Sequence, residues 1–183
     1  MAGKVSKKAF YEVQAPFTAT KILLYAGSPE ELMGRIIRLD LTRNLRGKSL
    51  ELKLRVKYEN GLLTAEPVAL ELAGSYIRRM VRKGTDYVED SFQANCKDSL
   101  VIIKPFLITR NKVSRALRRT LREQAKAHLE SYLKARTARE VFTDITTNKI
   151  QKELSMKLKK IYPLALCEIR VFTLVEAKKK LLA

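Results

Sequence analysis

The fold is decided by the stretch LELKLRVKYENG, residues 50–61. Apolar side chains occupy every second position from Leu50 to Tyr58, and charged side chains occupy the positions between them. This period of two predicts an antiparallel strand with one buried face. The dipeptide Asn60-Gly61 is typical of a tight turn between two strands. We therefore expect residues 62–72 to return as the second strand of a hairpin.

Other strands are predicted on both sides of this hairpin. Residues 34–41 form a candidate strand upstream, and residues 85–95 and 99–109 form two more downstream, with a turn at 96–99. A last strand is expected at 164–176. Between the strands, residues 75–84 have a helical pattern, with Ser75 to cap the start and Gly84 to end the helix.

The last third of the chain is mainly helical. One helix is predicted from Ser114 to Ala135, and a second begins at Thr137, because Thr137 and Glu140 have the spacing of a capping box. A third helix, within 147–161, ends before Pro163.

This order predicts an α+β fold with a mainly antiparallel, barrel-like sheet, a short helix between strands and a C-terminal group of packed helices. We expect one domain over residues 1–183. It has a strand-rich part (1–109), a basic helical part (110–162) and a closing strand with a tail (163–183).

The net charge is unusually high. In 183 residues, 37 Lys and Arg against 19 Asp and Glu give +18. A compact domain with this excess repels itself unless a polyanion neutralises it. Nucleic acid is the first candidate partner and an anionic membrane surface the second. A soluble protein that is merely basic is the remaining alternative.

The charge is ordered along the helix predicted at 114–135. On a helical wheel, Leu117, Leu121, Ala125, His128 and Tyr132 share the core side. We define the cationic row as Arg115, Arg119, Arg122 and Lys126. This row lies well away from the core side, Arg118 lies between the two faces, and Glu123 and Glu130 are expected off the row. Arg can bind two phosphate oxygens at once, so the row predicts phosphate binding.

Positive charge recurs in nearly every predicted element, which suits a protein that touches phosphates of a large folded RNA from several sides. Aromatic residues that could stack on bases, Tyr11, Phe17 and Tyr25, are expected in the core instead. The principal phosphate contacts are predicted to be Arg110, Lys112, Arg115, Arg118, Arg119, Arg122 and Lys126. The next are predicted to be Arg78, Arg79, Arg82, Lys83, Lys7 and Lys8.

No catalytic constellation can be assembled from the sequence. Residues 42–49 end like a phosphate-binding loop, but Thr42 replaces the required first glycine, and a strand rather than a helix follows. His128 is the single histidine and belongs to the apolar side of its helix. Asp86 and Asp90 share a strand face without a partner. We therefore predict that the chain is not an enzyme.

Cofactors, metals and membranes are not expected either. Cys96 and Cys167 belong to no CxxC or Cys-His cluster, which argues against zinc and favours two reduced thiols. The first ten residues have no apolar segment of a signal peptide, and no apolar run has the length of a membrane span. We expect no cofactor and no metal, and a cytoplasmic location.

Four stretches resemble one family in sequence and in order. These stretches are FYEVQAP (10–16), GRIIRLDLTRNL (34–45), YIRRMVRKGTDYVED (76–90) and KKIYPLALCEIRV (159–171). They are similar to motifs of the small-subunit ribosomal protein family S-three-A-e (e-S-one), archaeal type. The chain departs from the family pattern at Phe10, where Trp is usual.

The resemblance implies a structural constituent of the small ribosomal subunit that binds its rRNA. It implies a place on the subunit platform near the mRNA exit, with neighbouring ribosomal proteins and the messenger RNA close by. Two alternatives remain open at this point. One is a free-standing nucleic-acid-binding protein, chromatin-like or an RNA chaperone, and the other is an RNA-modifying enzyme.

Overall fold

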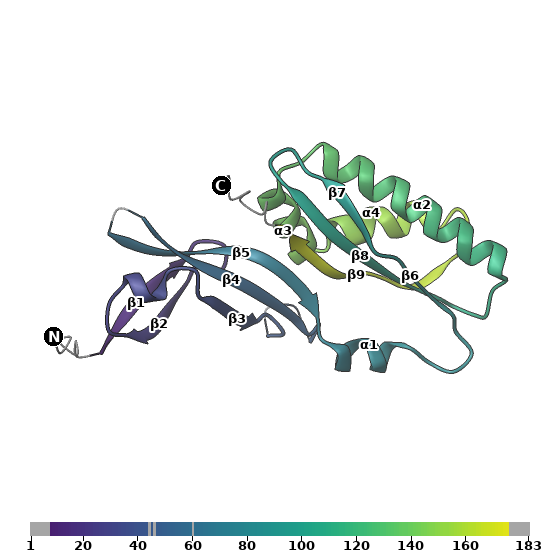
Figure 1. The fold of residues 1–183 in the computed structure, drawn as a ribbon. Helices are drawn as coiled ribbons and strands as arrows, with labels where there is room; N and C mark the ends of the chain where they lie inside the picture. The colour runs from purple at the N-terminus through teal and green to yellow at the C-terminus, as the bar shows by residue number, and fades with distance from the viewer. Residues whose placement is uncertain (1–7, 44, 46, 60, 176–183) are drawn as a thin grey trace, which may run out of the picture. The chain divides into compact units, whose positions relative to one another are not determined.

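The computed structural model describes residues 8–43, 45, 47–59 and 61–175 (Figure 1). By contacts, the chain divides into two compact units. Unit 1 comprises Met1–Asp40 and Leu52–Val68, and unit 2 comprises Leu41–Glu51 and Ala69–Ala183. Whether they form the one domain expected from the sequence stays a prediction. Lys7, one of the predicted RNA contacts, lies outside the described residues.

The hairpin predicted from residues 50–61 is present. It consists of β4 (Leu50–Glu59) and β5 (Leu62–Leu72), which pair with each other. Leu50, Leu52, Leu54 and Val56 are fully buried or nearly so, as the alternation predicts. Gly61 has φ +80°, a left-handed conformation that residues with a Cβ rarely adopt. The alternation and the turn glycine therefore account for this part of the fold.

Unit 1 contains a second hairpin, made of β1 (Ala9–Ala15) and β2 (Thr20–Ala26) in antiparallel register. A short 3-10 turn, η1 (Glu30–Leu32), and strand β3 (Ile36–Asp40) follow, and β3 pairs with β4. Val13, Ala15, Ala26 and Leu32 are buried. These side chains and the apolar side of β4 make the core of this unit.

Unit 2 contains the helices and the remaining strands. After α1 (Gly74–Met80) come β6 (Tyr87–Glu89), β7 (Phe92–Asn95) and β8 (Leu100–Thr109). Three helices follow, α2 (Arg115–Lys134), α3 (Ala138–Thr146) and α4 (Lys149–Leu158). Strand β9 (Leu164–Leu174) closes the described chain.

Two sequence predictions need correction here. The strand expected at 85–95 is divided into β6 and β7, which keep one register against β8 but leave a gap at Asp90 and Ser91, opposite Lys104 and Pro105. Proline has no N–H to donate, and β6 and β7 pair with β8 on either side of this point. The helix expected at 75–84 ends at Met80, and its N-cap is Ala73, without a side-chain hydrogen bond, instead of Ser75.

The sheet is mainly antiparallel, as predicted. Its strand order is β2-β1-β5-β9-β8-β6; in addition β4 pairs with β5, β3 pairs with β4, and β7 pairs with β8. Between β1 and β5 the described residues Gln14 and Thr64 pair in parallel. Among the described strands, the two ends of this order, β2 and β6, are not paired with each other. The barrel-like form of the sheet is therefore not confirmed.

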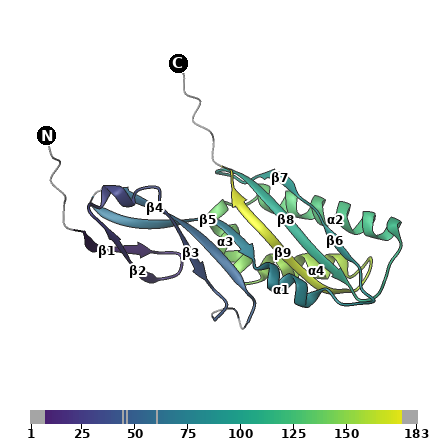
Figure 2. The same cartoon turned by 60° about the horizontal axis from the view of Figure 1, so that its bottom comes forward.

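In unit 2, helices α2, α3 and α4 lie on one face of strands β6–β9 (Figures 1 and 2). The core between them contains Ile103 and Phe172 from the strands and Phe142 from α3. The rings of Phe142 and Phe172 meet edge to face, with centroids 4.9 Å apart. This layer supports the long helix α2, whose exposed side carries the cationic row.

A buried ion pair fixes the segment 41–51 within unit 2. Lys48 Nζ donates to Glu168 Oε2 at 2.5 Å and to Asn148 Oδ1 at 2.7 Å. Lys48 and Glu168 are only 7% and 9% exposed. The pair therefore connects β9 and the start of α4 to a segment that precedes both by about one hundred residues or more.

Candidate nucleic-acid interface

The start of α2 is fixed by its own cap. Ser114 Oγ accepts a hydrogen bond from the Leu117 N–H at 3.3 Å, and the Ser114 carbonyl accepts one from the Arg118 N–H at 3.1 Å. The helix extends from Arg115 to Lys134, which confirms the prediction of a helix from Ser114 to Ala135. Its first turn contains no acidic residue, and all of α2 belongs to the described part of the chain.

Asp86 positions the segment that leads into α2. Its Oδ2 accepts a hydrogen bond from the Val113 N–H at 2.9 Å, and its backbone carbonyl accepts one from the Thr109 N–H at 2.9 Å. The predicted contacts Arg110 and Lys112 lie on this short segment and are exposed. From the sequence alone, Asp86 was expected on a strand face without a partner. Its role depends on a contact with residues 23 to 27 positions away, which no local pattern reveals.

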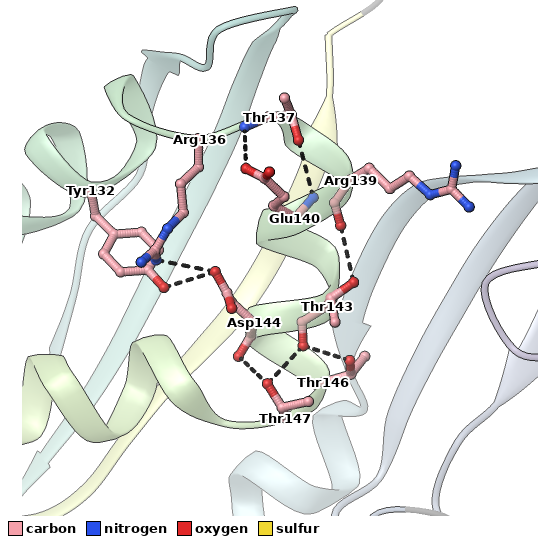
Figure 3. A network of polar contacts seen from close by, with 9 residues as sticks. All are labelled: Tyr132, Arg136, Thr137, Arg139, Glu140, Thr143, Asp144, Thr146 and Thr147. Atoms are coloured by element: carbon pink, nitrogen blue, oxygen red, sulfur yellow. Dashed lines mark hydrogen bonds and ion pairs between the residues drawn. The ribbon is translucent and has the colours of Figure 1, made fainter.

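The other end of α2 is anchored by a polar cluster (Figure 3). The Arg136 guanidinium lies over the Tyr132 ring at 3.6 Å from the centroid, and its Nη1 is 3.1 Å from Asp144 Oδ2. The Tyr132 hydroxyl donates to the same carboxylate oxygen at 2.8 Å. One carboxylate of α3 thus holds both a ring of α2 and the arginine that follows this helix.

The capping box predicted at the start of α3 is confirmed. The Glu140 N–H donates to Thr137 Oγ1 at 3.4 Å, and the Thr137 N–H donates to Glu140 Oε2 at 3.0 Å (Figure 3). The hydrogen bond from the Thr137 N–H lowers the pKa of the Glu140 carboxyl. The Ala138 N–H donates to Asp98 Oδ1 at 2.9 Å, so the turn after β7 also holds this junction. The Arg139 side chain points away from the cluster (Figure 3).

The buried side of α2 differs in detail from the helical-wheel prediction. Leu121, Ala125 and Tyr132 are buried as expected, but Leu117 and His128 are only half-buried. Leu129 and Leu133, which the wheel prediction left out, are fully buried. The helix packs against α4 as well as against β6 and β7, so its buried side is wider than one stripe.

All four members of the cationic row are exposed. The two acidic residues expected off the row nevertheless reach it with their side chains, and Arg119 Nε donates to Glu123 Oε1 at 2.8 Å. Lys126 Nζ is 3.9 Å from Glu130 Oε1. Both pairs are exposed, and exposed pairs of this kind stabilise a helix little and are screened by salt. The row is thus partly neutralised by neighbours that a phosphate can displace.

The row is not uniform along its length. Lys126 Nζ lies 5.6 Å from the centroid of the Phe92 ring, toward β7. Arg122 lines a concavity of about 600 Å³ together with Glu89, Asp90 and Arg170. Arg118 is half-buried, and its Nε has no hydrogen-bond partner among the described residues. The start of the row, where Arg115 follows Arg110 and Lys112, is therefore the part most open to an anion.

The second group of predicted contacts lies elsewhere. Arg78 and Arg79 are exposed on α1, whereas Arg82 and Lys83 are exposed in the loop after it. Figures 1 and 2 show α1 on the far side of β9 from α2. The fold thus gathers the contacts from Arg110 to Lys126 along α2 and the segment before it but does not bring the group around α1 to them. Lys8 belongs to unit 1 and is exposed.

The aromatic residues expected in the core behave differently from one another. Tyr11 and Phe17 are half-buried, but Tyr25 is 53% exposed, so the prediction of core packing is wrong for Tyr25. Its alternation within β2 places it on the outer face of that strand. Neighbouring Phe10 is also exposed, with ring centroids 5.0 Å apart.

The two cysteines are free thiols. Burial raises the pKa of Cys167 to about 12 and that of Cys96 to about 11. A thiol this difficult to ionise is a poor nucleophile and a poor metal ligand.

Within the described ranges, no group of three or more His, Cys, Asp and Glu side chains could hold a metal ion. No helix in that part of the chain is long and apolar enough to cross a membrane.

Fold and charge together are those of a basic α+β protein of the kind that binds a polyanion. The model of the Ribosomal S3Ae family matches residues 1–178, and the chain belongs to this family. It is 27% identical over 184 residues to "Small ribosomal subunit protein eS1" of Nanoarchaeum equitans, covering 96% of this chain and 93% of that protein. The protein of the same name from Desulfurococcus amylolyticus is 25% identical over 174 residues, covering 91% and 82%. That from Methanothermobacter thermautotrophicus is 27% identical over 132 residues, covering 71% and 68%.

These comparisons confirm the family resemblance found in the sequence. The chain is a ribosomal protein with archaeal relatives of the small subunit, and its family is one of structural proteins and not of enzymes. Ribosomal RNA and other ribosomal proteins are the partners that this membership implies.

Proposed function

We propose that this protein binds small-subunit rRNA through phosphate contacts made by α2 and the segment before it. In this proposal it acts on the platform of the cytoplasmic small subunit near the mRNA exit, with messenger RNA passing close by. The family resemblance supports the location. The charge and geometry of α2 support the mode of binding.

The observation that carries the proposal is the open, acid-free start of α2. Arg110, Lys112 and Arg115 are exposed there, and the first turn of α2 has no acidic residue. Cations at a helix N-terminus are unfavourable, because the helix dipole places partial positive charge at the same end. A phosphate bound there relieves this repulsion and accepts hydrogen bonds from side chains and from the helix terminus.

The anchoring of both ends of α2 supports the same proposal. Asp86 fixes the entrance to the helix, and the Tyr132–Arg136–Asp144 cluster fixes its exit. The cationic side chains between these points are therefore carried on a rigid element. Because α2 is already ordered, its backbone loses little conformational entropy when RNA binds to the row.

A salt titration with a charge-reversed variant tests the proposal. The variant replaces Arg115, Arg119 and Arg122 by Glu, and a matched control replaces the exposed unit 1 residues Lys21, Arg35 and Arg38 by Glu. Binding of each protein to small-subunit rRNA is measured as a function of salt concentration. The slope of log K on log salt is expected to flatten by about 0.7–0.9 for each phosphate that the variant no longer binds.

The control separates local contacts from total charge, because both variants change the net charge by the same amount. We expect the slope to flatten in the α2 variant and to change much less in the control. Equal slopes for the α2 variant and the parent protein would remove α2 from the RNA-binding surface. Equal effects of both variants would show diffuse attraction in place of a binding row.

A further inference from the structure

The outer face of the β1–β2 hairpin carries a contiguous apolar patch. The strands pair so that Phe10 is opposite Tyr25 and Glu12 is opposite Leu23. Phe10, Leu23 and Tyr25 are 71%, 65% and 53% exposed. The two rings touch, with centroids 5.0 Å apart, and Leu23 is two residues from Tyr25 on the same face of β2. We call these three side chains the hairpin patch.

The hairpin does not need this patch for its own core. The alternate positions of the same strands face the other way and supply the buried residues Val13, Ala15 and Ala26. The outward positions would be polar if water were their permanent environment, since strands with one solvated face alternate apolar and polar residues. Two adjacent strands with three large apolar side chains on the outward face therefore indicate a surface that another molecule covers.

The low net charge of unit 1 favours a protein over RNA as the partner of the hairpin patch. Unit 1 contains nine Lys and Arg against six Asp and Glu, a net +3 of the +18 of the whole chain. Beside the patch, Lys21 Nζ is neutralised by Glu12 Oε1 at 2.7 Å, and farther off Lys57 is paired with Glu66 at 2.6 Å. The centre of a protein–protein interface has this composition, aromatic and depleted of free charge. Unit 2, with 28 Lys and Arg against 13 Asp and Glu, has the excess that phosphates need.

We propose that the hairpin patch docks an apolar segment of a neighbouring protein of the small subunit. The proposal rests on the proposed function, because it takes the neighbour from the assembled subunit. Among the described strands, β2 pairs only with β1, so the main-chain groups of its other edge are also available to an extended segment. Lys8, whose Nζ is 6.0 Å from the centroid of the Tyr25 ring, borders the patch.

Photo-cross-linking identifies the class of partner. A benzophenone amino acid replaces Tyr25 in one protein and Glu66, an exposed residue of β5, in a control protein. Each protein is incorporated into small subunits and irradiated, and its cross-linked products are identified by mass spectrometry. We expect the Tyr25 probe to cross-link a ribosomal protein in higher yield than the Glu66 probe. Cross-linking to rRNA, or a yield no higher than at Glu66, would overturn the proposal.

A patch variant separates this proposal from the proposed function. Phe10→Ser, Leu23→Ser and Tyr25→Ser are combined in one protein, and its melting temperature is measured to show that the fold is retained. We expect unchanged affinity and salt slope for free rRNA, but incorporation into small subunits lowered by about tenfold or more, as when one or two central interface residues are truncated. Normal incorporation would refute the docking role and leave the RNA-binding role of α2 standing. A loss of affinity for free rRNA would instead assign the patch to RNA.

Discussion

The buried pair of Lys48 and Glu168 makes the stability of unit 2 sensitive to one side chain. In the variant Lys48→Met, the Glu168 carboxylate keeps its buried position but loses the ammonium group that lies 2.5 Å away. Asn148 Oδ1 also loses its donor. Removing one partner of a buried ion pair leaves an uncompensated charge in a medium that solvates it poorly, which is far more costly than removing both partners.

The expected loss is about 3–5 kcal/mol in the free energy of unfolding. For a chain of this length, that corresponds to a fall of roughly 10 °C or more in melting temperature. The double variant Lys48→Met with Glu168→Leu removes both charges and fills the space with apolar groups. We expect it to recover most of the lost stability, so that the two substitutions are strongly non-additive.

Thermal unfolding followed by circular dichroism measures the single variant, the double variant and a control variant against the parent protein. The matched control is the exposed pair of α2, in which Arg119→Met removes the partner of Glu123. This pair is solvated, so we expect its loss to leave the melting temperature nearly unchanged. If Lys48→Met destabilises no more than Arg119→Met, or if the double variant is as unstable as the single one, the reasoning from burial is refuted.

Three further predictions concern the positioning of α2, the junction after it and the thiols. Asp86→Ala raises the net charge by one, yet we expect it to weaken rRNA binding and to cost about 1–2 kcal/mol of stability, because the Val113 N–H loses its acceptor. Binding is measured by filter retention, and tighter binding would show that total charge alone matters. Thr137→Ala removes one half of the capping box and is expected to cost about 1 kcal/mol in urea unfolding, and no change would remove the cap from the stability of α3. Cys96 and Cys167 are expected to react with iodoacetamide at pH 8 only after unfolding. Because the fold disfavours the Cys167 thiolate, the unfolding free energy falls as pH rises from about 9 toward about 12, and this fall is expected to be smaller in Cys167→Ala.

Features of the fold that depend on neighbouring residues could be predicted from the sequence. The alternation at 50–58 and the turn at Gly61 give the β4–β5 hairpin, and the capping box gives the start of α3. The extent of α2 follows from its periodicity. Each of these signals arises from contacts between residues only a few positions apart, which is why a single sequence contains them.

Features that depend on distant contacts could not be predicted. No local pattern indicates that Lys48 is buried, because its partner Glu168 is 120 residues away. The gap opposite Lys104 and Pro105 that divides a predicted strand depends on pairing with β8, and the open edges of the sheet depend on all strands together. On α2, the rotamer that pairs Arg119 with Glu123 is a local choice that the helical wheel does not contain. The alternation of β2 indicates that Tyr25 shares a face with Lys21 and Leu23 but does not say which face is covered.

The central claim is that the N-terminal part of α2 lies along RNA phosphates in the ribosome. A cryo-electron microscopy map of small subunits that contain this chain, at a resolution that shows side chains, tests it most directly. We predict that the guanidinium groups of Arg115 and Arg119 lie within about 4 Å of phosphate oxygens, the distance of an ion pair. A map in which this side of α2 faces solvent or another protein would contradict the claim.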